Sequence, residues 1–139
     1  MNLQIIHEVN GIQKDYVRNK IRDYNYMHFP DELKGRYQEV NLLLQDTEGN
    51  LCGGIIGEIC WNWLEIHYLY VEQEYRKLGY GKKLMSEVEK IAKDKQCEFI
   101  KVDTLSFQAL DFYKKDGYEV FGVIQNAGRH THYYLKKNI

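Results

Sequence analysis

The sequence predicts one α/β domain of the α+β type, built on a mixed, mostly antiparallel sheet with helices on both faces. Two observations predict it. Apolar runs of strand length form a meander in the first half of the chain, which implies antiparallel neighbours. A strand–helix–strand unit follows, and such a unit joins parallel strands through a helix that covers the sheet. The 139 residues contain no linker-like segment, so we expect a single domain over residues 1–139.

The N-terminal quarter predicts one strand and helices. Leu3 to Val9 is apolar and of strand length. Ile12 to Met27 carries apolar residues near one helical stripe, and Pro30 limits that helix or separates it from a second short helix around Asp31 to Tyr37.

The meander follows. Val40 to Gln45 is a strand by composition, residues 46–50 form a turn, and Leu51 to Trp61 makes the second arm of a hairpin. Three glycines in that arm, at positions 53, 54 and 57, indicate a bulge or the close approach of another backbone. Leu64 to Val71 is the next strand.

The C-terminal half predicts two helices and three strands. A helix begins near Lys82, with apolar residues at helical spacing on one side. The other expected elements are a strand at Phe99 to Thr104, a short helix at Gln108 to Lys115 and two last strands at Tyr118 to Ile124 and His132 to Leu135.

Composition excludes several function classes. The net charge of −1 argues against broad affinity for nucleic acid or for an anionic membrane. No apolar run approaches the length of a membrane span, and the N-terminus lacks the pattern of a signal peptide. The cysteines, three in number and widely spaced, form no disulfide framework, so we expect a cytoplasmic protein.

The segment Arg76-Lys77-Leu78-Gly79-Tyr80-Gly81 predicts a site for a phosphate-bearing ligand. It lies between a predicted strand and a predicted helix N-terminus. Glycines let backbone N–H groups approach an anion, and the helix dipole favours negative charge at that end. A Walker loop is excluded because Arg76 stands in place of its first glycine and Lys83 in place of its Ser/Thr. A Rossmann fingerprint is excluded because Leu84 stands where its third glycine belongs.

The remaining pattern, Arg-x-x-Gly-x-Gly after a strand, resembles the coenzyme A loop of the GNAT (Gcn5-related N-acetyltransferase) superfamily. A second block, Ala109-Leu110-Asp111-Phe112-Tyr113-Lys114-Lys115-Asp116-Gly117-Tyr118, is similar to that family's helix and following strand. The resemblance covers nearly the whole chain. It implies an N-acyltransferase that moves an acetyl group from acetyl-CoA to a primary amine. The alternative is a non-catalytic acyl-CoA-binding or regulatory domain on the same fold.

The resemblance also implies where acetyl-CoA binds. The central strands splay apart, and the pantetheine pairs with the main chain of Leu69, Tyr70 and Val71, with an N–H near Tyr70 facing the thioester oxygen. The loop from Arg76 to Lys82 holds the pyrophosphate by backbone N–H groups; it comprises Arg76, Lys77, Leu78, Gly79, Tyr80, Gly81 and Lys82. Ser106 departs from the family pattern, which often has asparagine there, and its hydroxyl is the candidate for that cofactor contact.

Tyr113 matches the family's general acid, which protonates the departing thiolate. Glu65 is in the position of the glutamate base of the histone-acetylating branch. Alternation along a regular strand places Glu65, His67 and Leu69 on one face, so a carboxylate and an imidazole are candidates for the base. Water is the third candidate, and the sequence does not choose among them.

The acceptor side is the least specified. Tyr24, Asn25 and His28 lie where the family's acceptor-side helices lie, so they are candidates for the amine pocket. The acceptor is a small-molecule amine or a protein amine. His130 and His132 share a strand face, but without a cluster of further ligands nearby in sequence we predict no metal site. A homodimer is in keeping with the resemblance.

Overall fold

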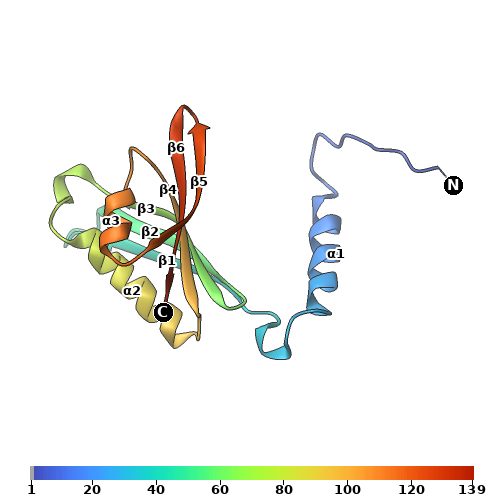
Figure 1. The fold of residues 1–139 in the computed structure, drawn as a ribbon. Coiled ribbons are helices and arrows are strands. Elements are labelled where there is room, and N and C mark those ends of the chain that lie inside the picture. Colours follow the sequence, from blue (N-terminus) through green and yellow to red (C-terminus); the bar gives the residue numbers. More distant parts are fainter. Residues whose placement is uncertain (1) are drawn as a thin grey trace. The chain divides into compact units, whose positions relative to one another are not determined.

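The structure, a computed structural model, describes residues 2–139 (Figure 1). The chain divides into two units, residues 1–34 and residues 35–139, and each is described by itself. Whether the two units work as the single domain predicted from the sequence stays a prediction.

The first unit contains one α-helix, α1 (Lys14–Tyr26), and one short 3-10 helix, η1 (Asp31–Leu33). The strand predicted at Leu3 to Val9 is wrong, because these residues have no regular secondary structure and are exposed. A strand needs a hydrogen-bonded neighbour, and no described residue of this unit forms a second strand. The predicted helix is confirmed with slightly shorter bounds, and the second one is a single 3-10 turn.

The second unit contains the sheet. Its elements are β1 (Tyr37–Gln45), β2 (Leu51–Cys60), β3 (Trp63–Val71), η2 (Gln73–Tyr75), α2 (Tyr80–Asp94), β4 (Phe99–Leu105), α3 (Leu110–Lys115), β5 (Glu119–Ala127) and β6 (His130–Asn138). Each corresponds to a predicted element except η2, which is one turn long. The last two strands extend beyond their predicted bounds because the tight turn lies at residues 128–129, later than the sequence indicated.

The six strands form one mixed sheet in the order β1-β2-β3-β4-β6-β5. Four of the five pairings are antiparallel, and β3 with β4 is parallel. The parallel pair is the one joined through α2, as a strand–helix–strand crossover requires. The predicted fold class, a mixed and mostly antiparallel sheet with helices, is confirmed. Within residues 35–139 both α-helices lie on one face, so the expectation of helices on both faces stays a prediction.

Within residues 35–139, α2 and α3 lie on one face of the sheet, here called the helix face (Figure 1). Alternate strand residues point into this layer and meet the buried side of α2. The fully buried side chains include Ile55, Leu64, Ile66, Met85, Val88, Ile100 and Leu135. The opposite face carries no helix from residues 35–139, and we call it the open face. No described helix is long and apolar enough to cross a membrane.

The glycines of β2 mark close backbone approach, as the sequence indicated. A Cβ at Gly57 would lie 2.5 Å from the carbonyl oxygen of Glu65, and one at Gly53 would lie 2.4 Å from that of Tyr70. Any side chain there would push β3 away. These two positions bracket the part of β3 in which its pairing with β4 ends.

Candidate active site

The sheet forks between β3 and β4. Their parallel pairing covers four pairs and ends at Ile66↔Val102. Beyond that point β3 continues to Val71 along β2, while β4 continues to Leu105 along β6. The edge of β3 that faces the fork therefore has no strand partner among the described residues, so its backbone groups are available to an extended ligand.

A β-bulge lies at the mouth of the fork. In the β2–β3 ladder Gly57 pairs with Ile66 and Ile56 pairs with Tyr68, so His67 is the extra residue. The bulge reverses the alternation beyond it. Leu69 pairs with the buried Ile55 and joins the helix-face core. The prediction that Glu65, His67 and Leu69 share one face is therefore wrong for Leu69, because it assumed a regular strand.

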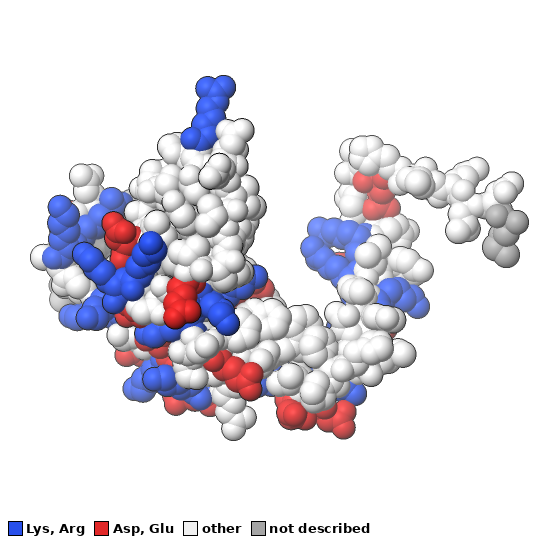
Figure 2. Space-filling view, viewed as in Figure 1, with Lys and Arg blue, Asp and Glu red and all other residues white. Residues whose placement is uncertain are grey.

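The glycine loop connects β3 to α2. Gly79 precedes the helix with φ of +89°, a left-handed conformation that glycine adopts without strain. No side chain caps the first N–H groups of α2. Amides at the start of an α-helix have no intrahelical partner, so those of the first turn are free to meet an anion. Figure 2 shows Lys and Arg side chains gathered around the start of α2.

Arg76 braces this loop against β3. Its Nε donates a hydrogen bond of 2.7 Å to the carbonyl oxygen of Val71, and its guanidinium lies 5.3 Å from the ring centroid of Tyr70. The side chain thus fixes the end of β3 where pantetheine pairing is expected. It also engages the Val71 carbonyl, and the Tyr70 carbonyl lies toward Gly53 of β2, so of these three carbonyls that of Leu69 is the candidate at the fork edge.

The other loop residues differ in their surroundings. Lys77 adopts a left-handed φ of 64°, and Leu78 is 62% exposed. Tyr80 packs edge-on against Tyr75, and the Lys83 ammonium lies 5.1 Å from the Tyr80 ring. Lys82 lies in the first turn of α2, at the positive end of its dipole.

An open depression of about 450 Å³ lies over Glu72, Gln73 and Glu74, just before the loop. Two carboxylates there would repel a pyrophosphate, so electrostatics favours the following loop as the anion site.

Tyr113 comes from α3 and is buried, with 4% of its surface exposed. Its ring meets that of Tyr118 at 5.8 Å in an edge-on contact. Burial, and then the negative charge of Asp103, raise the pKa of Tyr113 to about 12. The phenol therefore stays protonated at neutral pH and acts as a hydrogen-bond donor. The effect of Asp103 also shows that this buried ring lies within electrostatic reach of the β4 side of the fork.

Glu65 lies on the open face within the paired part of the sheet. It is in register with Lys101 of β4, and their side chains form a salt bridge of 3.0 Å between Lys101 Nζ and Glu65 Oε1. The predicted base thus already has a cationic partner in the protein.

His67 pairs with Glu58 of β2, at 3.3 Å between Nε2 and Oε1. Burial by itself would raise the pKa of Glu58, but hydrogen bonds from Tyr37, Cys60 and His67 outweigh it and hold that pKa below its ordinary value. Ligand-type atoms of Glu58, Glu65 and His67 lie within 4.8 Å of one another. Because each of the three has a protein partner, we interpret them as a hydrogen-bonded network. The sequence analysis missed Glu58; its position opposite the bulge on β2 becomes visible only with the strand register.

Ser106 closes the far end of the β4–β6 pairing. Its Oγ accepts a hydrogen bond of 3.3 Å from the Thr131 amide, and its own amide donates to the Thr131 carbonyl at 2.8 Å. Its hydroxyl proton remains available for an acceptor on a cofactor, so that contact stays a prediction.

His130 and His132 have different partners. His130 lies edge-on to Phe107, whereas His132 Nε2 lies 2.6 Å from Asp103 Oδ2, within hydrogen-bond distance. Sequence reasoning missed Asp103, because the carboxylate reaches the histidine through the β4–β6 pairing rather than through proximity in the chain.

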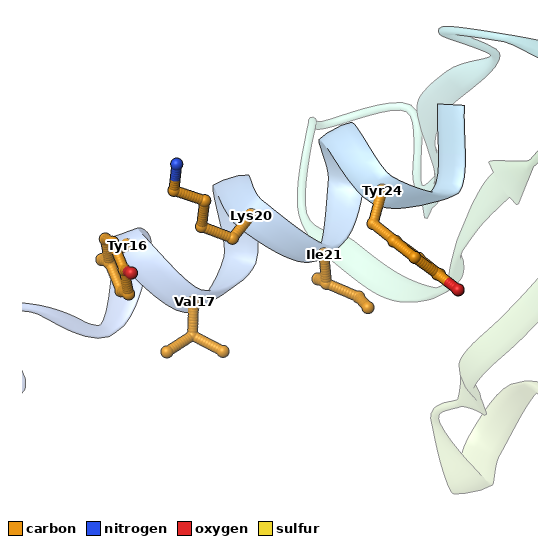
Figure 3. Close-up of a pocket in the computed structure, with 5 residues that line it drawn as sticks. All are labelled: Tyr16, Val17, Lys20, Ile21 and Tyr24. Carbon is orange, nitrogen blue, oxygen red and sulfur yellow. The ribbon is translucent and has the colours of Figure 1, made fainter. Parts of the chain in front are cut away.

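The predicted acceptor residues belong to the first unit. Tyr24 is 58% exposed, and its ring meets that of His28 in a tilted contact with centroids 4.9 Å apart. The carbonyl of Asn25 accepts hydrogen bonds from the amides of His28 and Phe29 and ends the helix. Figure 3 shows Tyr24 and Ile21 among the side chains that line one depression on α1. The role of these residues in acceptor binding stays a prediction.

Comparisons with known proteins agree with this geometry. The family model described as "Acetyltransferase (GNAT) family" matches residues 9–118. Blasticidin-S acetyltransferase from Streptomyces morookaense is 36% identical over 73 residues, which is 52% of this chain and 54% of that enzyme. The match thus spans about half of that relative's length.

Solved structures extend the likeness to the whole chain. The crystal structure of an acetyltransferase from Bacillus cereus ATCC 14579 has a TM-score of 0.91 at 36% identity, covering 98% of each chain. An aminoglycoside 6'-N-acetyltransferase complexed with coenzyme A shares the fold at a TM-score of 0.59 and 21% identity, over 99% of this chain and 97% of that one. With the forked sheet and the glycine loop already in place, the family match shows that the chain belongs to the GNAT acetyltransferase family.

Proposed function

We propose that this protein transfers an acetyl group from acetyl-CoA to a primary amine, which attacks the thioester directly. The observation that carries the proposal is the fork in the sheet. It combines an unpaired edge of β3, a glycine loop at the start of α2 and a protonated phenol on α3. A binding domain needs the first two features, whereas the phenol adds a group suited to the leaving thiolate.

The donor would bind along the fork. Its pyrophosphate would meet the free amides at the start of α2, and its pantetheine would pair with the main chain at Leu69 and Tyr70. An N–H near Tyr70 would then face the thioester oxygen and stabilise the negative charge that develops there. In this proposal Arg76 acts chiefly by fixing the loop, since its guanidinium already engages β3.

Tyr113 would act on the leaving thiolate as a hydrogen-bond donor. An ordinary thiol has a pKa of about 8.5, and the pKa of Tyr113 is about 12. Each pKa unit corresponds to about 1.36 kcal/mol, so complete transfer of the phenolic proton to the thiolate would cost about 5 kcal/mol. Donation without full transfer avoids this cost. The proton that finally neutralises the thiolate would then come from the nitrogen of the attacking amine, which loses it as the amide forms.

The acceptor is a primary amine of a small molecule or of a protein. Such an amine is largely protonated at neutral pH, so it must lose a proton before or during the attack. Glu65, His67 and water remain the candidates from the sequence. Glu65 already forms a salt bridge with Lys101, and His67 already contacts Glu58.

Thiol release from acetyl-CoA with a panel of primary amines tests the proposal. We expect release with at least one amine and a mass increase of one acetyl group on that amine. The alternative function is non-catalytic acyl-CoA binding. Tight coenzyme A binding without release for any amine, including lysine-containing peptides, would favour that alternative and contradict transfer.

We also infer a homodimer and a cytoplasmic location. Support for the dimer comes from α1, where apolar side chains form a stripe on one side, with none of them buried (Figure 3). The stripe comprises Tyr16, Val17, Ile21 and Tyr24, and Lys20 lies among them. An isolated helix of 13 residues is marginally stable, so a contact with another apolar surface would stabilise it. Support for the cytoplasm comes from the cysteines, all of which are free.

A further inference from the structure

The structure contains a second carboxylate–imidazole pair beside the fork, on the side opposite His67. Asp103 of β4 and His132 of β6 meet at 2.6 Å between Oδ2 and Nε2. The other ring nitrogen of His132, Nδ1, lies 3.3 Å from the hydroxyl of Tyr134, and the centroids of the two tilted rings are 4.5 Å apart. Three side chains thus form one hydrogen-bonded chain, which we call the β4–β6 relay.

Strand register places this relay at the mouth of the fork. The last β3–β4 pair is Ile66↔Val102, so Asp103 is the first residue of β4 beyond it. Asp103 pairs with Tyr134, and Leu105 pairs with His132, so the relay residues share the open face. His67 is the first residue of β3 beyond the last pair and faces the same side. The two imidazole–carboxylate pairs therefore flank the opening from opposite strands.

The relay is also coupled to the expected leaving-group site. The charge of Asp103 contributes, after burial, to the raised pKa of Tyr113. The two groups come from different elements, β4 and α3, so this effect reflects proximity in space. A base on the open face and a phenol on the helix face would thus lie on either side of the thioester.

The charged and titratable surroundings of His132 are few. Asp103 faces it from β4 and Tyr134 from its own strand, and the β5 residue in register is the uncharged Ile124. On its own strand His130 lies two residues away, against Phe107. The cations Lys101 and Lys136 on this face are a pair in register, with Lys101 two residues before Asp103. Lys101 is engaged by Glu65, and Lys136 lies 5.9 Å from the ring of Phe99.

We propose that His132 is the base that deprotonates the acceptor amine, with Asp103 and Tyr134 as its positioning residues. This proposal rests on the proposed function. Asp103 at 2.6 Å accepts the Nε2 proton and so fixes the tautomer whose lone pair is at Nδ1. Nδ1 lies on the side of the Tyr134 hydroxyl, where a proton can arrive directly or through that hydroxyl.

The proton balance is simple. The ammonium group of the acceptor gives one proton to Nδ1 and becomes a neutral amine, while His132 becomes an imidazolium paired with the Asp103 carboxylate. The amine nitrogen forms a bond to the thioester carbon, the carbon–sulfur bond breaks, and the thiolate leaves. One further proton lost by the new amide nitrogen neutralises the thiolate, so no other reactant is needed.

The geometry favours His132 over the candidates from the sequence. The Asp103–His132 contact is 2.6 Å, against 3.3 Å for Glu58–His67. The Glu58 carboxylate is shared among His67, Tyr37 and Cys60, so less of its charge is available to stabilise an imidazolium. Glu65 is neutralised by Lys101. A close, undivided carboxylate is the better support for a histidine base.

The test is the pH dependence of kcat/KM for a panel amine that gives thiol release. For the wild-type protein we expect activity to fall at low pH as one imidazole protonates. In His132→Asn we expect kcat/KM to be about 10²-fold lower, with this acidic limb lost, while the affinity for coenzyme A is unchanged. Asp103→Asn should lower kcat/KM in the same direction. His130→Asn, on the same strand but outside the relay, is the matched control and should behave as wild type.

Two further measurements separate catalysis from folding. Added imidazole should restore part of the activity of His132→Ala, which a purely structural role would not allow. In the folded wild-type protein, long-range ¹H–¹⁵N spectra of the imidazoles should show the His132 proton on Nε2, and Asp103→Asn should change that tautomer.

The outcomes are distinct. If no amine releases thiol, the proposed function fails and this inference fails with it. If release occurs but His132→Asn keeps both its rate and its acidic limb, only the relay is overturned; loss of that limb in His67→Asn instead would assign the base to β3.

Discussion

Replacing Tyr113 by phenylalanine removes a buried phenol whose pKa is about 12 in the folded protein, against about 10 in an unfolded chain. Because the pKa of Tyr113 is higher in the folded protein than in the unfolded chain, this group stabilises the folded state. Its contribution to the free energy of unfolding is fully present below pH 10 and is lost as the pH rises through 12. Between pH 8 and pH 11 the wild-type protein should therefore lose about 1.4 kcal/mol through this group, one pKa unit of linkage free energy. Tyr113→Phe cannot titrate there, so its stability should decline less with pH by that amount.

Urea unfolding followed by far-UV circular dichroism at the two pH values measures this difference. Tyr68→Phe is the matched control, because Tyr68 is 72% exposed and its replacement should leave the pH dependence as in wild type. Equal pH dependence in Tyr113→Phe and wild type would refute the buried, neutral phenol. The same variant should also lower kcat about 10²-fold with little change in coenzyme A affinity.

Three other substitutions test the loop and the helix stripe. Arg76→Lys keeps the charge but loses the guanidinium bond to the end of β3, so coenzyme A affinity measured by calorimetry should fall about tenfold; unchanged affinity would contradict the bracing role. Gly79→Ala and Gly49→Ala both force alanine into a left-handed φ, of +89° and +87°, at a cost of about 1 kcal/mol each. Only Gly79→Ala should also weaken coenzyme A binding, and equal losses of affinity would argue against the loop. Ile21→Glu should shift the mass measured by light scattering from dimer to monomer, whereas Arg22→Glu, which helical periodicity places on the opposite side of α1, should not; a monomeric wild type would contradict the dimer.

Much of the fold of residues 35–139 could be predicted because its signals are local. Residues such as Leu84, Val88 and Ala92 repeat at helical spacing, and all three are buried on α2. The glycines of β2 indicated close approach, and Cβ positions there meet the β3 backbone. The strand predicted at Leu3 to Val9 was wrong for the opposite reason. Its apolar residues are typical of a strand, but a strand forms only beside a hydrogen-bonded neighbour, which the local sequence does not specify.

Only the parts of the candidate site that lie within sequence motifs could be predicted from the sequence. The glycine loop and Tyr113 lie inside sequence blocks of fixed spacing, so both were singled out. Glu58 and Asp103 were missed because each contacts a histidine on a neighbouring strand, His67 and His132 respectively. The register of those strand pairs depends on bulges and turns, which the sequence does not specify. A bulge at His67 also reversed the alternation that placed Leu69 with Glu65. Pairwise contacts across strands therefore needed the three-dimensional structure.

Acyl transfer at the fork between β3 and β4 is the activity that we propose for this protein. The most direct measurement is thiol release from acetyl-CoA with an amine panel, run in parallel for the wild-type protein and Tyr113→Phe with mass detection of the acetylated amine. We expect at least one amine to gain an acetyl group, at a rate that is about 10²-fold lower in Tyr113→Phe than in the wild-type protein. Coenzyme A binding with no acetylated amine, or equal rates for the two proteins, would contradict it.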